Sequence, residues 1–329
     1  MFCHHQFFGY GWSESQYGWC YHISLMRFNT PISGTSNKDT LRRFVFENTP
    51  IRGNTVHLSS TIELALEHQD YPKVLRYALG ELMAAASLLA ATLKMQGALI
   101  LQIQGSGPLK LLVVECTDQM TMRATAKWNE ELTDELPEIN FIELIGSGQF
   151  VITLDPKDGN QAYQGVVALE GANISQVLQN YMLRSEQIET RIWLACDDQS
   201  AAGLLLQKLP DQPEQDMDAW NRISLLADTV HHEELLGLPA DILLQRLFHE
   251  EDVRLFESQP VAFHCSCSRN GVAAMLRLLG QEEVRSIIEE RGKIEVHCDF
   301  CNQLYEFDQV DAEQLFTAEI ILPASDSRH

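Results

Sequence analysis

Four cysteines toward the C-terminal end of the chain are grouped closely enough to act together. Cys265 and Cys267 form one pair, and Cys298 and Cys301 form a second pair after the stretch 268–297. Two short pairs of thiolates can supply the four tetrahedral ligands of a structural Zn²⁺ site, because each pair provides two ligands from one tight turn. The spacing therefore predicts a zinc site formed by these four residues, with a cluster of unmetallated thiols as the alternative.

Neighbouring histidines offer an alternative set of ligands. His264 precedes one cysteine pair and His297 precedes the other. With four thiolates available, we expect both imidazoles to lie at the surface and not to bind metal. The remaining cysteines are scattered along the chain: Cys3, Cys20, Cys116 and Cys196. Cys116 ends an apolar run, which predicts a small core residue.

Zinc is also expected to decide whether this part of the chain folds. Structural zinc contributes about 10–16 kcal/mol to small finger peptides. A domain formed by residues 261–329 would have only roughly 3–10 kcal/mol without it, by per-residue scaling. We therefore expect the domain to fold with zinc and to unfold without it. Since thiolates can be oxidised and Zn²⁺ cannot, the same four residues could form a redox switch.

Other motifs that could take part in chemistry give weaker evidence for a functional site. Two Gly-Ser-Gly sequences, 105–107 and 146–148, lack the third glycine of a dinucleotide-binding loop, and we expect both to form hairpin turns. The histidine–glutamate clusters at 231–234 and 249–251 lack the helical spacing of zinc proteases and are expected on solvated helix faces. The sequence shows no phosphate-binding loop and no nucleophile paired with a base, so we do not expect an enzyme.

The composition argues against some classes of binding partner. The 329 residues include 24 Lys and Arg against 46 Asp and Glu, a formal charge of −22. This charge argues against binding nucleic acid or anionic lipid through phosphate groups. The apolar run Leu82–Leu93 is shorter than the about 20 residues that span a bilayer, so it predicts a buried core helix. Without a signal-peptide pattern at the start, we expect a cytoplasmic protein whose thiols stay reduced.

The segments that position the cysteines differ in character. Residues 1–35 are rich in aromatic side chains without periodicity, and we expect an unstructured extension. Residues 36–210 mix helical spacing with short strand-like runs, which favours an α+β core domain over a doubly wound sheet. Residues 211–260 have helical apolar spacing and a local charge of −9, which predicts a metastable linker of two or three amphipathic helices. Residues 261–329 form the zinc-binding domain.

Local signals define the expected elements. A Ser-Ser-Thr cap is expected to begin one helix near residue 60, and Pro72 a second helix that ends at Gly97. A further helix is expected at 174–184, and the zinc-binding domain should contain helices at 272–279 and 281–290. Strands are predicted at 98–104, 109–116, 120–127, 150–155, 162–169, 191–196 and 203–207.

The cysteine pairs with their neighbours resemble a known family, the redox-regulated thirty-three-kilodalton heat-shock holdase chaperones of bacteria. The resemblance covers residues 39 to about 316 and leaves out the aromatic extension, which that family lacks. Matching stretches are Phe46-Glu47-Asn48, Asp70-Tyr71-Pro72, Tyr163-Gln164-Gly165-Val166-Val167, Arg184-Ser185-Glu186-Gln187 and Leu247-Phe248-His249-Glu250-Glu251. The two cysteine segments match position for position: His264-Cys265-Ser266-Cys267-Ser268-Arg269 and His297-Cys298-Asp299-Phe300-Cys301.

This resemblance implies a mechanism. The reduced, zinc-bound protein would be inactive, and oxidation would join Cys265 to Cys267 and Cys298 to Cys301 as disulfides and release zinc. The zinc-binding domain and the linker would then unfold. Newly exposed apolar surface would bind unfolding client proteins, prevent their aggregation and support a homodimer, without ATP.

Two other classes of function stay open at the level of the sequence. A zinc-ribbon protein that binds nucleic acid is disfavoured by the acidic charge. In a thiol oxidoreductase, Cys298 and Cys301 would be catalytic, but the second cysteine pair and the lack of a thioredoxin-like strand–helix context argue against it. The zinc content of reduced and oxidised protein would separate the three classes.

Overall fold

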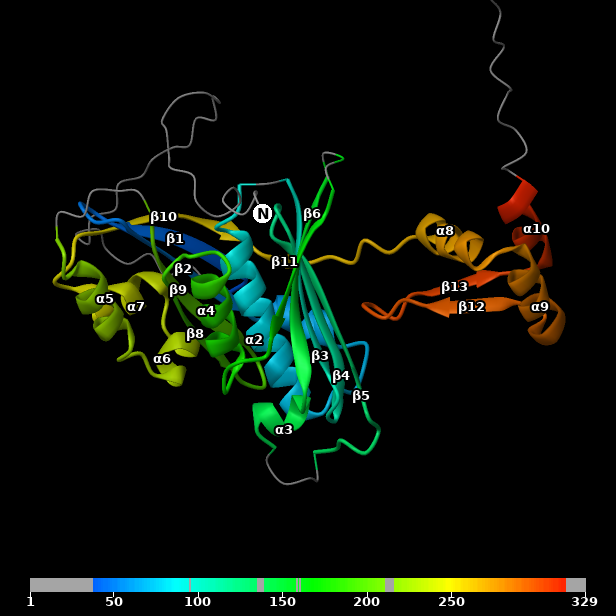
Figure 1. Ribbon diagram of the computed structural model, residues 1–329, viewed down its shortest axis with the longest axis horizontal. Helices are drawn as coiled ribbons and strands as arrows, with labels where there is room; N and C mark the ends of the chain where they lie inside the picture. The colour runs from blue at the N-terminus through cyan, green and yellow to red at the C-terminus, as the bar shows by residue number, and fades with distance from the viewer. Residues whose placement is uncertain are drawn as a thin grey trace, which may run out of the picture. The chain divides into compact units, whose positions relative to one another are not determined.

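The computed structural model describes residues 38–94, 96–134, 139–157, 159, 161–210 and 216–317. The chain divides into two compact units between His264 and Cys265. The predicted extension, residues 1–35, lies outside the described residues. Helices and sheets confirm the predicted α+β class (Figure 1).

Two sheets form the first unit within the described residues. The strands of one sheet are β1 (Thr40–Phe46), β2 (Ile51–Leu58), β8 (Thr190–Cys196), β9 (Ala201–Lys208) and β10 (Val253–Pro260). Those of the other are β3 (Gly97–Gly105), β4 (Leu109–Thr117), β5 (Thr121–Trp128), β6 (Gly148–Pro156), β7 (Tyr163–Ala168) and β11 (Ala262–Phe263). The orders are β10-β1-β2-β9-β8 and β11-β5-β4-β3-β6-β7. All neighbours pair antiparallel except β11 and β5.

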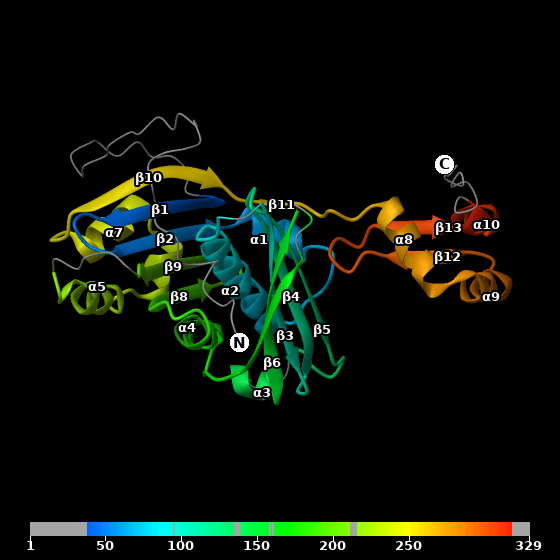
Figure 2. The same cartoon turned by 45° about the horizontal axis from the view of Figure 1, so that its top comes forward.

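A long helix, α2 (Lys73–Ala90), lies between the two sheets (Figure 2). It contacts β2, β8 and β9 on one side and β3, β4 and β5 on the other, so it must be apolar almost all round. Its fully buried side chains include Leu75, Leu79, Leu82, Met83 and Leu88. The predicted core helix is confirmed, but it ends at Ala90, whereas Gly97 begins β3 with a φ of 151°. No described helix has both the length and the apolar character that crossing a membrane requires.

The helix α1 (Ser60–Leu66) begins where the Ser-Ser-Thr signal predicts, but its cap comes from elsewhere. The side chain of Ser59 forms no capping bond. The carboxylate of Asp39 instead accepts hydrogen bonds from the amides of Ser59, Ser60 and Thr61 at 2.8–3.0 Å. Burial would raise the pKa of Asp39, yet these hydrogen bonds hold it below its usual value.

Short helices cover the other face of the first sheet within residues 216–260. They are α5 (Ala219–Ala227), α6 (His232–Gly237) and α7 (Ala240–Phe248), at the left of Figure 1. Their apolar side chains form a second core with β1 and β9. The predicted helices of the acidic segment are therefore present, but the segment also contains β10, a strand that helical spacing does not predict. The division of this part into linker and core domain stays a prediction.

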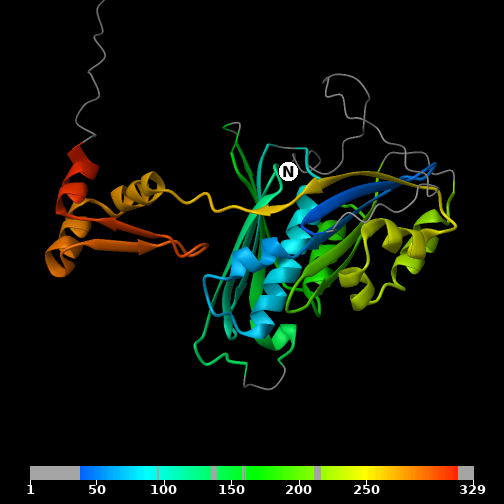
Figure 3. The same ribbon diagram turned by 180° about the vertical axis from the view of Figure 1, so that it is seen from behind.

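The second unit is built on a β-hairpin (Figure 3). Its strands, β12 (Ile294–His297) and β13 (Leu304–Phe307), pair antiparallel. The helices α8 (Arg269–Leu279), α9 (Gln281–Arg291) and α10 (Gln309–Thr317) pack with the hairpin around a small core of their own. The helices predicted at 272–279 and 281–290 are confirmed, whereas the hairpin and α10 were not predicted.

Candidate metal centre

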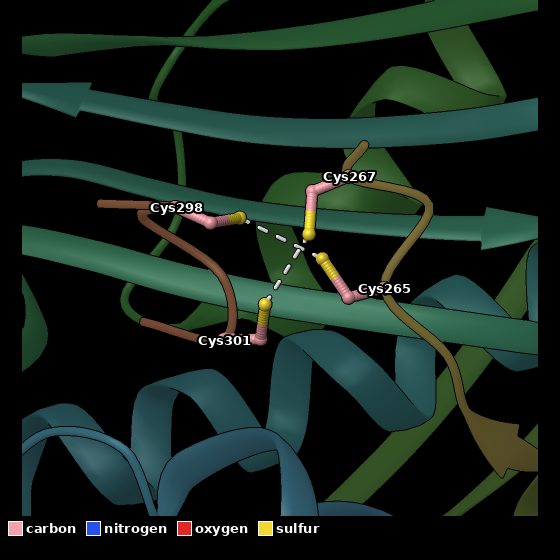
Figure 4. A group of neighbouring side chains, drawn as sticks. All are labelled: Cys265, Cys267, Cys298 and Cys301. Atoms are coloured by element: carbon pink, nitrogen blue, oxygen red, sulfur yellow. Dashed lines mark hydrogen bonds between the residues drawn. The ribbon is translucent and has the colours of Figure 1, made fainter. Parts of the chain in front are cut away.

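The four predicted cysteines come together in the second unit (Figure 4). Their Sγ atoms all lie within 4.8 Å of one another, and among the described residues they form the only such group of metal-ligating side chains. The Sγ atoms of Cys265 and Cys298 are 3.6 Å apart, and those of Cys267 and Cys301 are 3.4 Å apart. A tetrahedral Zn²⁺ with bonds of about 2.3 Å separates its sulfur ligands by about 3.8 Å, so the cluster fits such an ion.

The first cysteine pair is held at the start of α8. The side chain of Ser268 caps this helix by accepting a hydrogen bond from a backbone amide of the first turn at 3.1 Å. Arg269, the next residue, donates to a backbone carbonyl of β13 at 2.6 Å and to the carboxylate of Asp311 in α10 at 2.8 Å. Cys265 and Cys267 are thereby attached to the hairpin that carries the other pair.

The second cysteine pair lies in the turn between β12 and β13. The amide of Cys298 donates to the carbonyl of Gln303 at 3.0 Å, and the amide of Asn302 donates to the carbonyl of Cys298 at 2.8 Å. Asn302 has a φ of 55°, in the left-handed region that asparagine tolerates better than most residues. These bonds close the turn and hold the Cys298 and Cys301 sulfurs on the same side as the first pair (Figure 4).

Tyr305 is a site residue that the sequence analysis missed. Its hydroxyl donates a hydrogen bond to Sγ of Cys267 at 3.1 Å. This hydrogen bond, together with burial, raises the pKa of Tyr305 to about 12. A donor to a ligand atom orients the ligand and stabilises its anionic form. The alternating residues Leu304–Phe307 are the signal that could have found it, because they predict a strand that leaves the second cysteine pair.

In the protein alone, the surroundings of Cys301 favour its protonated thiol. Burial raises the pKa of Cys301, and hydrogen bonds with the other three cysteines add to this effect. A divalent cation has the opposite effect, because it binds thiolates and displaces their protons. The donor set therefore fits a cation that prefers sulfur ligands and tetrahedral geometry.

Neither predicted alternative ligand belongs to the cluster. The amide of His264 donates to the carbonyl of Met122 at 3.0 Å, which continues the pairing of β11 with β5. The imidazole of His297 lies 3.1 Å from the side-chain oxygen of Asn302. As predicted, Cys116 is fully buried, and burial raises its pKa to about 12.

The two Gly-Ser-Gly sequences meet in the first unit. The amide of Ser106 donates to the carbonyl of Ser147 at 2.8 Å. The first sequence forms the predicted turn between β3 and β4. The second joins the short helix α3 (Phe141–Ile145) to β6, so its prediction as a hairpin turn is wrong.

Comparison with known proteins links this site to a family. A family model described as Hsp33 protein matches residues 39–308, which include all four cysteines. A 33 kDa chaperonin of Methylobacillus flagellatus is 60% identical over 293 residues, which cover 88% of this chain and 99% of the relative. A 33 kDa chaperonin of Chromobacterium violaceum is 49% identical, covering 89% of this chain and 99% of the relative.

A solved structure shows the same fold. The crystal structure of a 33 kDa chaperonin, a heat shock protein 33 homolog from Thermotoga maritima, superimposes with a TM-score of 0.72. The two sequences are 21% identical, and the superposition covers 86% of this chain and 99% of the Thermotoga chain. At this sequence identity, the similarity is evidence for the fold alone. The family match, the two relatives and the gathered cysteines agree with the resemblance found in the sequence. The chain belongs to the Hsp33 family.

Proposed function

We propose that this chain is a redox-regulated, ATP-independent holdase chaperone, and not an enzyme, whose switch is the four-cysteine cluster. The observation that carries the proposal is the gathering of four Sγ atoms within 4.8 Å in a small, separate unit. The name of the relatives, chaperonin, supports a protein that acts on unfolded or partly unfolded client proteins.

In the reduced state, Cys265, Cys267, Cys298 and Cys301 hold one zinc ion as thiolates. An ion bound by these thiolates would cross-link the start of α8 to the β12–β13 turn. Because the second unit has only a small apolar core, loss of this cross-link removes much of its free energy of folding. The reduced, zinc-bound protein is the inactive form, and it acts in the cytoplasm, where thiols stay reduced.

Oxidation changes the ligands and not the metal. A peroxide takes two electrons from a pair of thiolates: the sulfur–sulfur bond forms, the oxygen–oxygen bond breaks, and two protons from solvent complete two waters. The proposed disulfides are Cys265–Cys267 and Cys298–Cys301. In the structure, the short sulfur–sulfur distances lie between the two pairs: 3.6 Å from Cys265 to Cys298 and 3.4 Å from Cys267 to Cys301. Each proposed disulfide therefore requires the two sulfurs of one pair to approach each other and to leave their contacts with the other pair.

Unfolding then spreads to the acidic helices α5, α6 and α7. Few cations hold them: Arg222, for example, pairs with Asp216 at 2.8 Å and with Glu251 at 2.7 Å. Beneath the helices lie Phe44 and Leu204, both fully buried. Release of the helices exposes this apolar face, which can bind unfolding clients and support a homodimer.

A light-scattering assay with a heat-unfolded client protein tests the proposal. Reduced protein with zinc should leave aggregation unchanged. Peroxide-oxidised protein should suppress it without nucleotide, and reductant with zinc should reverse the effect. Equal suppression by both forms, or a requirement for ATP, would contradict the proposal.

A further inference from the structure

β10 connects the acidic helices to the cysteine cluster and occupies one edge of the first sheet. It pairs antiparallel with β1, from Thr40 opposite Pro260 to Phe46 opposite Val253. The chain continues directly through β11 to the first cysteine, Cys265 (Figure 3, yellow to orange). β11, which pairs with β5, lies between the second unit and β10, and β10 is the strand of the first sheet nearest to the cluster along the chain.

Two alternate side chains of β10 fill the core beneath the acidic helices. Val253 and Leu255 are only 4% and 6% exposed, and they belong to the same core as Phe44, Phe46 and Phe248. The next residues of β10 are more exposed. Departure of β10 would leave a row of unpaired backbone groups along β1 and, beside it, an apolar recess with room for two alternate side chains.

The pairing of β10 with β1 is irregular. Arg42 lies opposite Ser258 and Phe44 opposite Leu255, so β10 has one more residue than β1 between these two pairs. Such a β-bulge interrupts the hydrogen bonds of the ladder. The guanidinium of Arg42 reaches the carbonyl of Phe256 in this stretch at 3.3 Å. A strand without the extra residue would pair with β1 without this interruption.

The outward edge of β10 is itself protected against pairing. β10 contains two charged residues, Arg254 and the exposed Glu257, and it ends at Pro260, which has no amide hydrogen to donate. Charged side chains and prolines are the usual means by which edge strands avoid other chains. While β10 is in place, it occupies this edge of the sheet, and its removal leaves the edge of β1 unpaired.

We infer that β10 is an internal substitute for a client: after its release, the edge of β1 binds an extended segment of an unfolding protein by strand addition. A fitting segment runs antiparallel to β1 and carries apolar side chains at two alternate positions, as Val253 and Leu255 do. The inference rests on the proposed function and assigns its client surface to the β1 edge and the recess beside it.

A fluorescent peptide with the sequence of residues 252–260 tests this assignment by anisotropy. It should bind the oxidised full chain at least tenfold more tightly than the reduced, zinc-bound chain. A control peptide with aspartate in place of Val253 and Leu255 should not bind measurably. Equal binding of the two peptides would overturn the inference.

Two further peptides test whether binding occurs by strand addition or by non-specific apolar contacts. Each carries one backbone N-methyl group, at the position of Arg254 or of Leu255. Successive amides of a strand point in opposite directions, so only one of the two faces β1. One methylated peptide should bind at least tenfold more weakly, and the other should bind as the parent does. Equal effects of the two methyl groups would overturn the inference.

A competition experiment distinguishes this inference from the proposed function. Excess parent peptide should reduce the suppression of client aggregation by the oxidised chain. If oxidised protein suppresses aggregation but does not bind the peptide, strand addition at β1 is wrong and the holdase function stands. If oxidised protein neither releases zinc nor suppresses aggregation, the proposed function itself fails.

Discussion

Each cysteine of the cluster supplies one of four sulfurs, so loss of one is expected to open the site. In Cys298→Ser a neutral hydroxyl replaces a thiolate, and hydroxyls are poor ligands for Zn²⁺. The reduced variant should lose its zinc to a chelator concentration that leaves the unmodified chain loaded. Cys196→Ser, outside the cluster, is the matched control and should retain zinc. Equal zinc content of Cys298→Ser and the control would refute the ligand assignment.

The hydroxyl of Tyr305 is expected to strengthen metal binding through Cys267. Tyr305→Phe removes only the donor to this sulfur and keeps the ring. Loss of such a contact typically weakens metal affinity about 10- to 100-fold. A tyrosine with an ordinary pKa of about 10 already keeps its proton at neutral pH, and the contact with Cys267 raises the pKa of Tyr305 further, so the difference should persist from pH 7 to pH 8. A chelator competition at pH 7 and pH 8 measures it, and identical affinities would show that the contact is only structural.

The sequence predicts the four sulfur ligands but not Tyr305. Two ligands within one turn are close neighbours whatever the rest of the chain does, so the spacing of Cys265, Cys267, Cys298 and Cys301 is enough to predict a site. Tyr305 reaches the site only because the hairpin pairs Val296 with Tyr305. That register depends on the folded turn and cannot be read from the spacing of the cysteines.

At the scale of elements, the contact of α7 with the first sheet is expected to keep the protein inactive. Leu244 is fully buried in the second core, and Leu→Ala at such a position costs about 2–5 kcal/mol. Leu244→Ala should therefore release the acidic helices more readily and suppress some aggregation even when reduced and zinc-bound. Leu225→Ala is the matched control, since Leu225 of α5 is 67% exposed. Identical behaviour of both variants in the light-scattering assay would contradict this role of α7.

Elements with a strong local signal were predicted well, whereas strands such as β2 and β10 were missed. The helix α4 (Ile174–Arg184) has the predicted bounds, because Asn173 caps it by accepting from the amide of Gln176 at 2.9 Å. The strand β2 was not predicted. The helix α2 covers one of its faces, and the core under α5–α7 covers the other. Almost every β2 residue is buried, so no alternation marks it. β10 was missed because only Val253 and Leu255 alternate in a stretch dominated by charge.

At the scale of the whole molecule, the first segment of the chain is expected to be dispensable. The family match begins at residue 39, and residues 1–35 show no periodicity that would pack them on a core. A chain that begins at Ser36 should match the full chain in melting temperature and in suppression of client aggregation after oxidation. A clear loss of either property would show that the aromatic segment is part of the working protein.

In the proposed function, the thiol state of the cluster controls the order of the acidic segment. Hydrogen exchange of the full chain, reduced with zinc and then oxidised, tests it most directly. Oxidation should raise exchange in α5–α7, in β10 and in the second unit, while residues 39–207 stay protected apart from the edge of β1. The same samples should begin to suppress client aggregation. If oxidised protein releases zinc while α5–α7 and β10 stay protected and aggregation continues, the account is contradicted, and the cluster is a structural metal site alone.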